Sequence, residues 1–155
     1  MGTTDRDYQD KPGHLARRFQ QIAVAVFQSE MDAIGCDITP VQYAALAAIN
    51  SYPGLDQASL AKEIALDRTT ITGVVDRLQS KGLIERSISK NDRRARALAV
   101  TPEGRSTLAL VRPGVEAAQR LMTRGLTAQE ANELLRLLRK AVDGANDLSR
   151  APQRI

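Results

Sequence analysis

The stretch from Asp67 to Gly82, DRTTITGVVDRLQSKG, constrains the fold of this chain more than any other segment. Its large apolar residues stand at i, i+3, i+4 and i+7, which at about 3.6 residues per turn gathers them on one narrow side of an α-helix. The stretch therefore predicts a short helix that packs on a core through Ile71, Val74, Val75 and Leu78.

Both ends of this helix are marked by their chemistry. Asp67 can accept from the unpaired N–H groups of the first turn, and Gly82 suits the left-handed residue just past the last turn. A polar and mostly small face, which can enter the DNA major groove, is formed by Arg68, Thr69, Thr72, Gly73, Asp76, Arg77 and Ser80. An ordinary amphipathic surface helix has the same pattern, so the flanking segments decide between the two interpretations.

The residues before this helix predict a shorter one over 57–64, followed by a turn at 65–67. Two helices joined by so short a turn, the second polar on its outer face, are typical of a helix-turn-helix. After Gly82, residues 83–88 alternate like a strand and residues 97–100 form an antiparallel return. The sequence thus predicts a helix-turn-helix followed by a hairpin.

The link between the two strands is SKNDRRAR, residues 89–96, which combines turn formers with basic side chains. Charged turns are often only solvated loops. Beside a candidate recognition helix, this one predicts the wing of a winged helix, with arginines that enter the minor groove. Asp92 would fix the loop by pairing with a nearby arginine, either Arg94 or Arg86.

The charge of the chain is concentrated in the same region. Its net charge is +4, and residues 68–96 hold eight Lys or Arg against three Asp or Glu, a local surplus of five. The rest of the chain is therefore slightly acidic, and the positive field is local. This distribution suits an anionic partner.

Long amphipathic helices are expected on both sides of this unit. We expect residues 1–12 to be a flexible arm, residues 13–34 to form a helix that Gly35 ends, and residues 39–51 to form another. Thr101-Pro102 and Thr127 begin two further helices, the last of which extends to about Leu148 before a flexible tail at 149–155. Pro113-Gly114 interrupts the first of these two, so a kink or a break is expected there.

These patterns define the fold class. We expect a mainly α protein with a small β-hairpin wing, in which residues 37–101 form a winged helix-turn-helix and residues 13–36 and 102–148 form a helical dimerisation region. The helices of the latter region have apolar faces that a small winged helix cannot cover, and large exposed apolar surfaces normally have a partner. A two-fold homodimer would bury them and place two recognition helices about 34 Å apart, one turn of DNA.

Composition excludes several other classes. Only 3% of residues are aromatic and the chain has one His and one Cys, Cys36, so neither an intrachain disulfide nor a Cys-based zinc site can form. Neither a Gly-rich phosphate loop nor a paired acidic motif with metal-ligand spacing is present, so we expect neither an enzyme nor a cofactor. Without a secretory signal or a long apolar run, a cytoplasmic protein without membrane contact is expected.

The segment from Leu60 to Gly104 resembles the MarR family of bacterial regulators. The resemblance rests on the helix signature VVDRL, the helix end KGLIER, the wing DRR and the post-wing TPEG. It implies a winged helix-turn-helix in a dimer that binds double-stranded DNA at a pseudo-palindromic operator, usually as a repressor. By matching positions, the DNA-binding residues would be Arg68, Thr69, Thr70, Thr72, Gly73, Asp76, Arg77, Lys90, Asp92, Arg93, Arg94 and Arg96.

The resemblance also implies a small-molecule effector. Most members release DNA when a small anion or phenolic compound binds between the dimer helices and the DNA-binding unit. Polar groups suited to such a ligand are His14, Arg17, Arg18 and Tyr43. The segments PGH at 12–14 and ITPVQY at 38–43 look like the branch of the family that governs breakdown of aromatic acids, so an aromatic carboxylate is the expected effector and a catabolic or efflux operon the expected target. The alternative is a winged helix that contacts an acidic protein without any DNA or ligand response.

Overall fold

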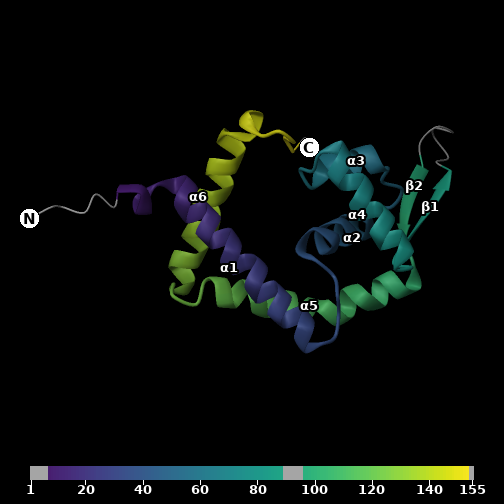
Figure 1. Cartoon of the computed structure of the whole chain (residues 1–155), viewed down its shortest axis with the longest axis horizontal. Helices are drawn as coiled ribbons and strands as arrows, with labels where there is room; N and C mark the ends of the chain where they lie inside the picture. Colours follow the sequence, from purple (N-terminus) through teal and green to yellow (C-terminus); the bar gives the residue numbers. More distant parts are fainter. Residues whose placement is uncertain (1–6, 89–95, 154–155) are drawn as a thin grey trace, which may run out of the picture.

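The computed structural model describes residues 7–88 and 96–153, and across them the chain forms α-helices, two short 3-10 helices and one antiparallel hairpin (Figure 1). In chain order these are η1 (Asp7–Asp10), α1 (Pro12–Ala33), α2 (Pro40–Ser51), α3 (Gln57–Glu63), α4 (Arg68–Ser80), β1 (Ile84–Ile88), β2 (Arg96–Val100), α5 (Pro102–Met122), α6 (Ala128–Gly144) and η2 (Asn146–Leu148). The predicted fold class, mainly α with a hairpin wing, is confirmed.

Side-chain caps begin the helices where the sequence predicts them. Thr39 and Gln42 form a reciprocal capping box at the start of α2, and Asp56 accepts from Ser59 N at 2.7 Å at the start of α3. Thr127 caps α6 in the same manner as Thr39. Each cap satisfies donors that have no partner within the helix, so the starts of these helices are fixed by local chemistry.

The core lies where α4 meets α2, α3 and the hairpin. The predicted apolar residues of α4 are all buried, with Val75 and Leu78 at 0% exposure. They pack in one cluster with Leu46 of α2, Leu60 of α3 and Leu98 of β2. Burial of each Leu, Ile or Val side chain stabilises the fold by about 1.5–3 kcal/mol relative to exposure to water. This burial fixes which side of α4 faces the core.

The hairpin pairs Ile84 with Val100 at its base and Ile88 with Arg96 toward its tip. The residues just before α3 pair with β2. Leu98 N donates to Leu55 O at 2.8 Å, and Asp56 forms an isolated β-bridge with Ala97. The segment before α3 is thereby attached to the middle of β2.

Of the kink or break expected at Pro113-Gly114, the break is wrong, because α5 runs continuously from Pro102 to Met122. Gly114 is instead a point of close approach between helices. A Cβ at this position would lie 3.1 Å from Met31 Cε and 3.3 Å from Glu30 Cβ of α1. The missing side chain lets α1 pack on α5 here, and this packing supports the helix across the proline.

Both ends of the chain are more structured than expected. Residues 7–10 form η1 instead of a flexible arm, and α1 begins at Pro12, a residue that is well suited to a first helical position. The last helix ends at Gly144 and only η2 extends to Leu148. Beyond it, Asn146 and Gln153 exchange hydrogen bonds of 2.8 and 2.9 Å, and Gln153 Nε2 donates to Glu63 O at 2.7 Å. The described part of the tail is thus attached to α3.

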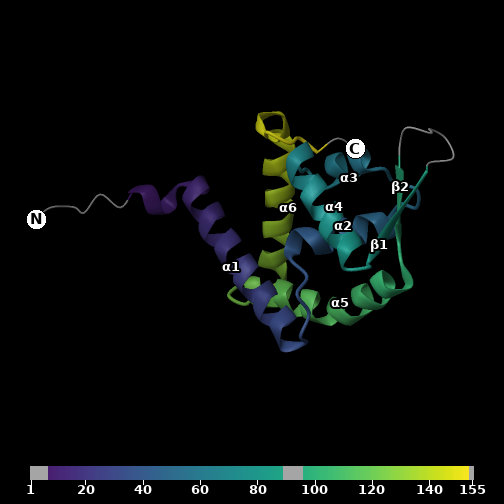
Figure 2. The ribbon, with the colours of Figure 1, turned by 45° about the vertical axis from the view of Figure 1, so that its right-hand side comes forward.

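The helices divide into two groups in space. Figures 1 and 2 show α2, α3, α4 and the hairpin gathered on one side, with α5 running beneath them to meet α1 and α6. In both views the first turns of α1 project away from the winged unit. Helix α6 has no buried residue in the single chain. No helix among the described residues is long and apolar enough to cross a membrane.

The close approach of the α5 start to the β1 start generates a stability prediction. A Cβ on Gly104 would overlap the carbonyl oxygen of Leu83 and lie 2.6 Å from Val100 Cγ1. We predict that Gly104→Ala lowers the free energy of unfolding in urea by about 1–3 kcal/mol, the usual cost of overpacking. The control is Gly73→Ala, where nothing lies within 4 Å and added helix propensity stabilises. Equal stability of the two variants would refute this account of Gly104.

Candidate nucleic-acid interface

The outer face of α4 is exposed along its whole length. The seven predicted residues on it are all exposed in the single chain: Arg68, Thr69, Thr70, Thr72, Gly73, Asp76 and Arg77. Arg96, at the start of β2, is exposed as well. The other predicted wing residues, Lys90, Asp92, Arg93 and Arg94, lie outside the described residues.

The first turn of α4 is fixed by Asp67. One carboxylate oxygen accepts from Thr70 N at 2.8 Å, and the other accepts from the Thr70 hydroxyl at 2.8 Å. The backbone N–H of Thr70, followed by its hydroxyl, lowers the pKa of the Asp67 carboxyl below its ordinary value of 3.8. The hydroxyl of Thr70 is used in this cap. Thr70 therefore stabilises the start of α4, although it also lies on the exposed face of the helix.

Asp76 has a partner within the protein. Its carboxylate lies 2.5 Å from an η nitrogen of Arg86 on β1. The Nε atom of Arg86 is buried without a hydrogen-bond partner, and within the described residues the guanidinium is held by its contact with Asp76. The pair joins the recognition helix to the first strand of the hairpin. This finding gives Arg86 a partner other than Asp92, the alternative considered from the sequence.

The remaining groups on this face are free to contact a ligand. Within the described residues, the side chains of Arg68, Thr69 and Arg77 make no hydrogen bond, and Gly73 leaves open space between them. Two guanidinium groups at the edges and hydroxyls between them form a surface that can lie on phosphates and reach base edges. The buried stripe behind this surface holds it rigidly.

The far end of α4 is attached to α2 by a network that the sequence analysis missed. Lys81 Nζ lies 3.0 Å from Gln42 Oε1, 3.1 Å from Asp37 Oδ1 and 3.2 Å from Asp37 O. Gln42 is only 4% exposed, and the same side-chain oxygen accepts from Thr39 N in the capping box. These residues are about 40 positions apart in sequence, so no local pattern indicated the contact.

A pocket of about 460 Å³ lies between α2 and α5. It is lined by Tyr43, one of the four ligand residues expected from the sequence, and by Arg105 and Arg112 of α5. Neither arginine was predicted, although their spacing of seven places both on one face of a helix and could have indicated them. Two cations and a phenol around one hollow can bind an anion that carries a polar ring substituent.

The other predicted ligand residues lie elsewhere in the chain. His14 stands 3.5 Å from Arg17 and packs edge-on against Tyr8, with ring centroids 5.3 Å apart. Arg18 lines a separate, mostly apolar groove of about 530 Å³ between α1 and α6. A single chain therefore does not bring these three residues together with Tyr43.

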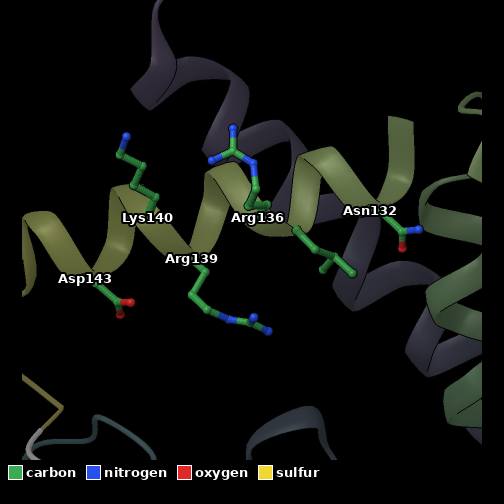
Figure 3. A pocket seen from close by; sticks show the side chains of 6 residues that line it. Asn132, Arg136, Arg139, Lys140 and Asp143 are labelled. Atoms are coloured by element: carbon green, nitrogen blue, oxygen red, sulfur yellow. The ribbon is translucent and has the colours of Figure 1, made fainter. Parts of the chain in front are cut away.

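The face of α6 carries a further hollow, of about 570 Å³, lined by residues of that helix alone. Figure 3 shows Arg136 and Lys140 on one side of α6 and Arg139 and Asp143 on the other. Arg136 is paired with Glu133 at 2.6 Å, and this contact raises the pKa of the guanidinium and lowers that of the carboxyl. No second element of the described chain covers this face.

Comparison with known proteins gives consistent results. The family model described as MarR family matches residues 38–95 of this chain, the span from the start of α2 to the wing. The HTH-type transcriptional repressor NicR of Pseudomonas putida is 32% identical over 145 residues, which cover 92% of this chain and 89% of NicR. The similarity therefore includes the flanking helices as well as the helix-turn-helix.

Solved structures share the same fold over almost their whole length. Bordetella bronchiseptica BpsR, from a study of the regulation of its DNA binding by 6-hydroxynicotinic acid, matches with a TM-score of 0.82 and 30% identity over 88% of this chain and 96% of that chain. Streptomyces coelicolor PcaV in complex with its natural ligand matches with a TM-score of 0.80 and 32% identity over 94% and 99%. PcaV is described as a transcriptional regulator, and BpsR as a protein whose DNA binding is regulated by 6-hydroxynicotinic acid.

Proposed function

The chain belongs to the MarR family of transcriptional regulators, and on that premise we propose that it is a dimeric repressor released from its operator by a small aromatic carboxylate. Its activity is DNA-binding regulation and not catalysis. The observation that carries the proposal is the outer face of α4, which is exposed, edged by guanidinium groups without a partner among the described residues and held rigid by a buried stripe.

The DNA contacts that we propose divide by chemistry. Arg68 and Arg77 contact phosphates at the two edges of the major groove, and Thr69 with Gly73 allows close approach to base edges. Thr70 and Thr72 line the same face, while Asp76 orients the helix through Arg86. For the wing, Lys90, Asp92, Arg93, Arg94 and Arg96 are proposed on the sequence pattern, with the arginines in the minor groove.

We predict that Arg77→Ala weakens DNA binding equally on specific and unrelated duplexes, since a phosphate contact carries no sequence information. The slope of log K against log salt should fall in magnitude by about one, the value of a single phosphate contact. Fluorescence anisotropy at several salt concentrations measures both quantities. Arg124→Ala, at an exposed position after α5, is the control and should bind as the wild type does.

The same titration separates DNA recognition from the alternative of a winged helix that contacts an acidic protein. Binding of duplex DNA with a preference for one sequence supports the regulator. Wild-type protein that binds no duplex at low salt supports the alternative.

A homodimer is proposed because α6 has apolar residues that the rest of the described chain leaves largely exposed. Leu135, Leu138 and Val142 are 57%, 41% and 61% exposed, and α6 lacks any buried residue in the single chain. Leu138 also lines the apolar groove against α1. A second copy that packs on α1 and α6 removes this surface from water and arranges two copies of α4 for a two-fold symmetric operator.

Leu138→Glu should convert the protein to a monomer, because the carboxylate opposes burial of the groove in the dimer. Light scattering coupled to size exclusion should give twice the chain mass of 16.9 kDa for the wild type and the chain mass for the variant. Circular dichroism checks that the variant keeps its helices, which is expected because Leu138 is not buried within one chain. Ile88→Glu, at a more exposed apolar position in the wing, is the control and should remain dimeric. A dimeric Leu138→Glu protein would contradict this interface.

The effector is proposed to bind in the pocket of Tyr43, Arg105 and Arg112. An aromatic carboxylate fits its chemistry, since the arginines can bind the carboxylate and the phenol can bind a ring hydroxyl. His14, Arg17 and Arg18 lie on the projecting first turns of α1. In the proposed dimer these three residues contribute to ligand binding from the second chain.

We predict that 6-hydroxynicotinate or a related benzoate binds the wild-type protein in calorimetry and lowers its DNA affinity. Arg112→Met should weaken ligand binding by about 10- to 150-fold, the effect of losing a charge-assisted hydrogen bond worth about 1.5–3 kcal/mol, and leave DNA affinity unchanged. Arg124→Met should bind ligand as the wild type does. Absence of heat with 6-hydroxynicotinate and with each related benzoate would remove the effector from the proposal and leave the DNA-binding function intact.

A further inference from the structure

Gln57, the first residue of α3, contacts the recognition helix from outside it. Its side-chain amide lies 3.0 Å from the hydroxyl of Thr72, one of the exposed residues on the DNA-facing side of α4. The two residues are 15 positions apart and come from different helices. The side chain of Gln57 is therefore placed beside the surface that we propose meets the major groove.

The hydrogen-bond pattern fixes the orientation of the Gln57 amide. The Thr72 hydroxyl donates its proton to Arg68 O at 2.9 Å, so toward Gln57 it can only accept. The contacting atom of Gln57 must then be its amide nitrogen, because the amide oxygen cannot donate. One N–H of the amide is used in this way, and the other N–H and the carbonyl oxygen remain available.

The backbone that carries Gln57 is held from two directions. Its neighbour Asp56 caps α3 through Ser59 N and bridges to Ala97 of β2. Leu55 O accepts from Leu98 N at 2.8 Å. The residue therefore lies at a fixed position between the middle of β2 and α4, and its side chain needs little ordering on binding.

The surroundings of Gln57 favour a polyanion. The hollow of about 410 Å³ between α3 and α4 is lined by Gln57, and also by Lys62 and Arg68, both exposed and neither hydrogen-bonded within the described residues. The nearby carboxylates of Asp56 and Asp67 are both engaged as helix caps. Positive charge thus flanks an oriented amide, which suits a base edge between two backbone phosphates.

We infer that Gln57 is a specificity-determining residue that acts with Thr72 as one recognition unit for a base pair, most suitably one containing adenine. The free N–H and carbonyl oxygen of the amide complement N7 and N6 of adenine, while Thr72 holds the amide in place. The inference rests on the proposed operator binding. It adds to the recognition surface a residue from α3, outside the recognition helix.

The test is selection from a duplex library with a random core by the wild-type protein, Gln57→Ala, Thr72→Val and the double variant. The wild type should enrich one motif, and Gln57→Ala should enrich it without preference at one base pair of each half-site. On a duplex with the wild-type motif, Gln57→Ala should bind about 5- to 150-fold more weakly than the wild-type protein. On a duplex changed only at that base pair, the two proteins should bind with equal affinity. The loss of affinity in the double variant should not exceed the larger of the two losses in the single variants, as expected for residues that act as a unit.

Gln129→Ala, an exposed glutamine in the first turn of α6, is the matched control and should keep motif and affinity. If Gln57→Ala selects the wild-type motif with full preference at every position, the inference is wrong, whether its affinity is unchanged or falls equally on all duplexes. If the wild type itself enriches no motif, the proposed operator binding fails instead, so the two failures are distinguishable.

Discussion

The burial of one face of α4 is the constraint on which the rest of the structure depends. Val75 and Leu78 are fully buried against α2, α3 and the hairpin. Because this face points into the core, the opposite, polar face of the helix is exposed to solvent. The cap at Asp67 and the ion pair of Asp76 with Arg86 then fix the start and the middle of the helix. A surface of small polar groups is useful for recognition only when it is rigid, and here the core supplies that rigidity.

A second physical link runs from α4 to the pocket between α2 and α5. Lys81, at the end of α4, is bound to Gln42, and the next residue, Tyr43, lines the pocket. Gln42 is buried, so a shift of the α2 start moves the partner of Lys81 as well. The Lys81–Gln42 contact is therefore a contiguous physical connection between the pocket and the recognition helix.

Much of the fold was predictable because its signals are local. Capping residues such as Thr39 and Thr127 act within three residues, and the spacing of the α4 stripe repeats within two turns, so their effects can be judged from the sequence. Pro113 was misjudged for the same reason. Its local effect is to interrupt a helix, whereas the packing of α1 against Gly114 is a contact between distant segments that supports α5 throughout.

The sequence by itself determined the order and type of the elements, the face of α4 that is buried and the face that is exposed, because helix periodicity and caps depend on residues a few positions apart. Only the tertiary structure decided which distant residues meet: Gln57 with Thr72, Lys81 with Gln42, and Tyr43 with Arg105 and Arg112. It also separated His14, Arg17 and Arg18 from Tyr43 within one chain. These pairings follow from how the helices cross, and that is set by the packing of the whole core and not by any local pattern.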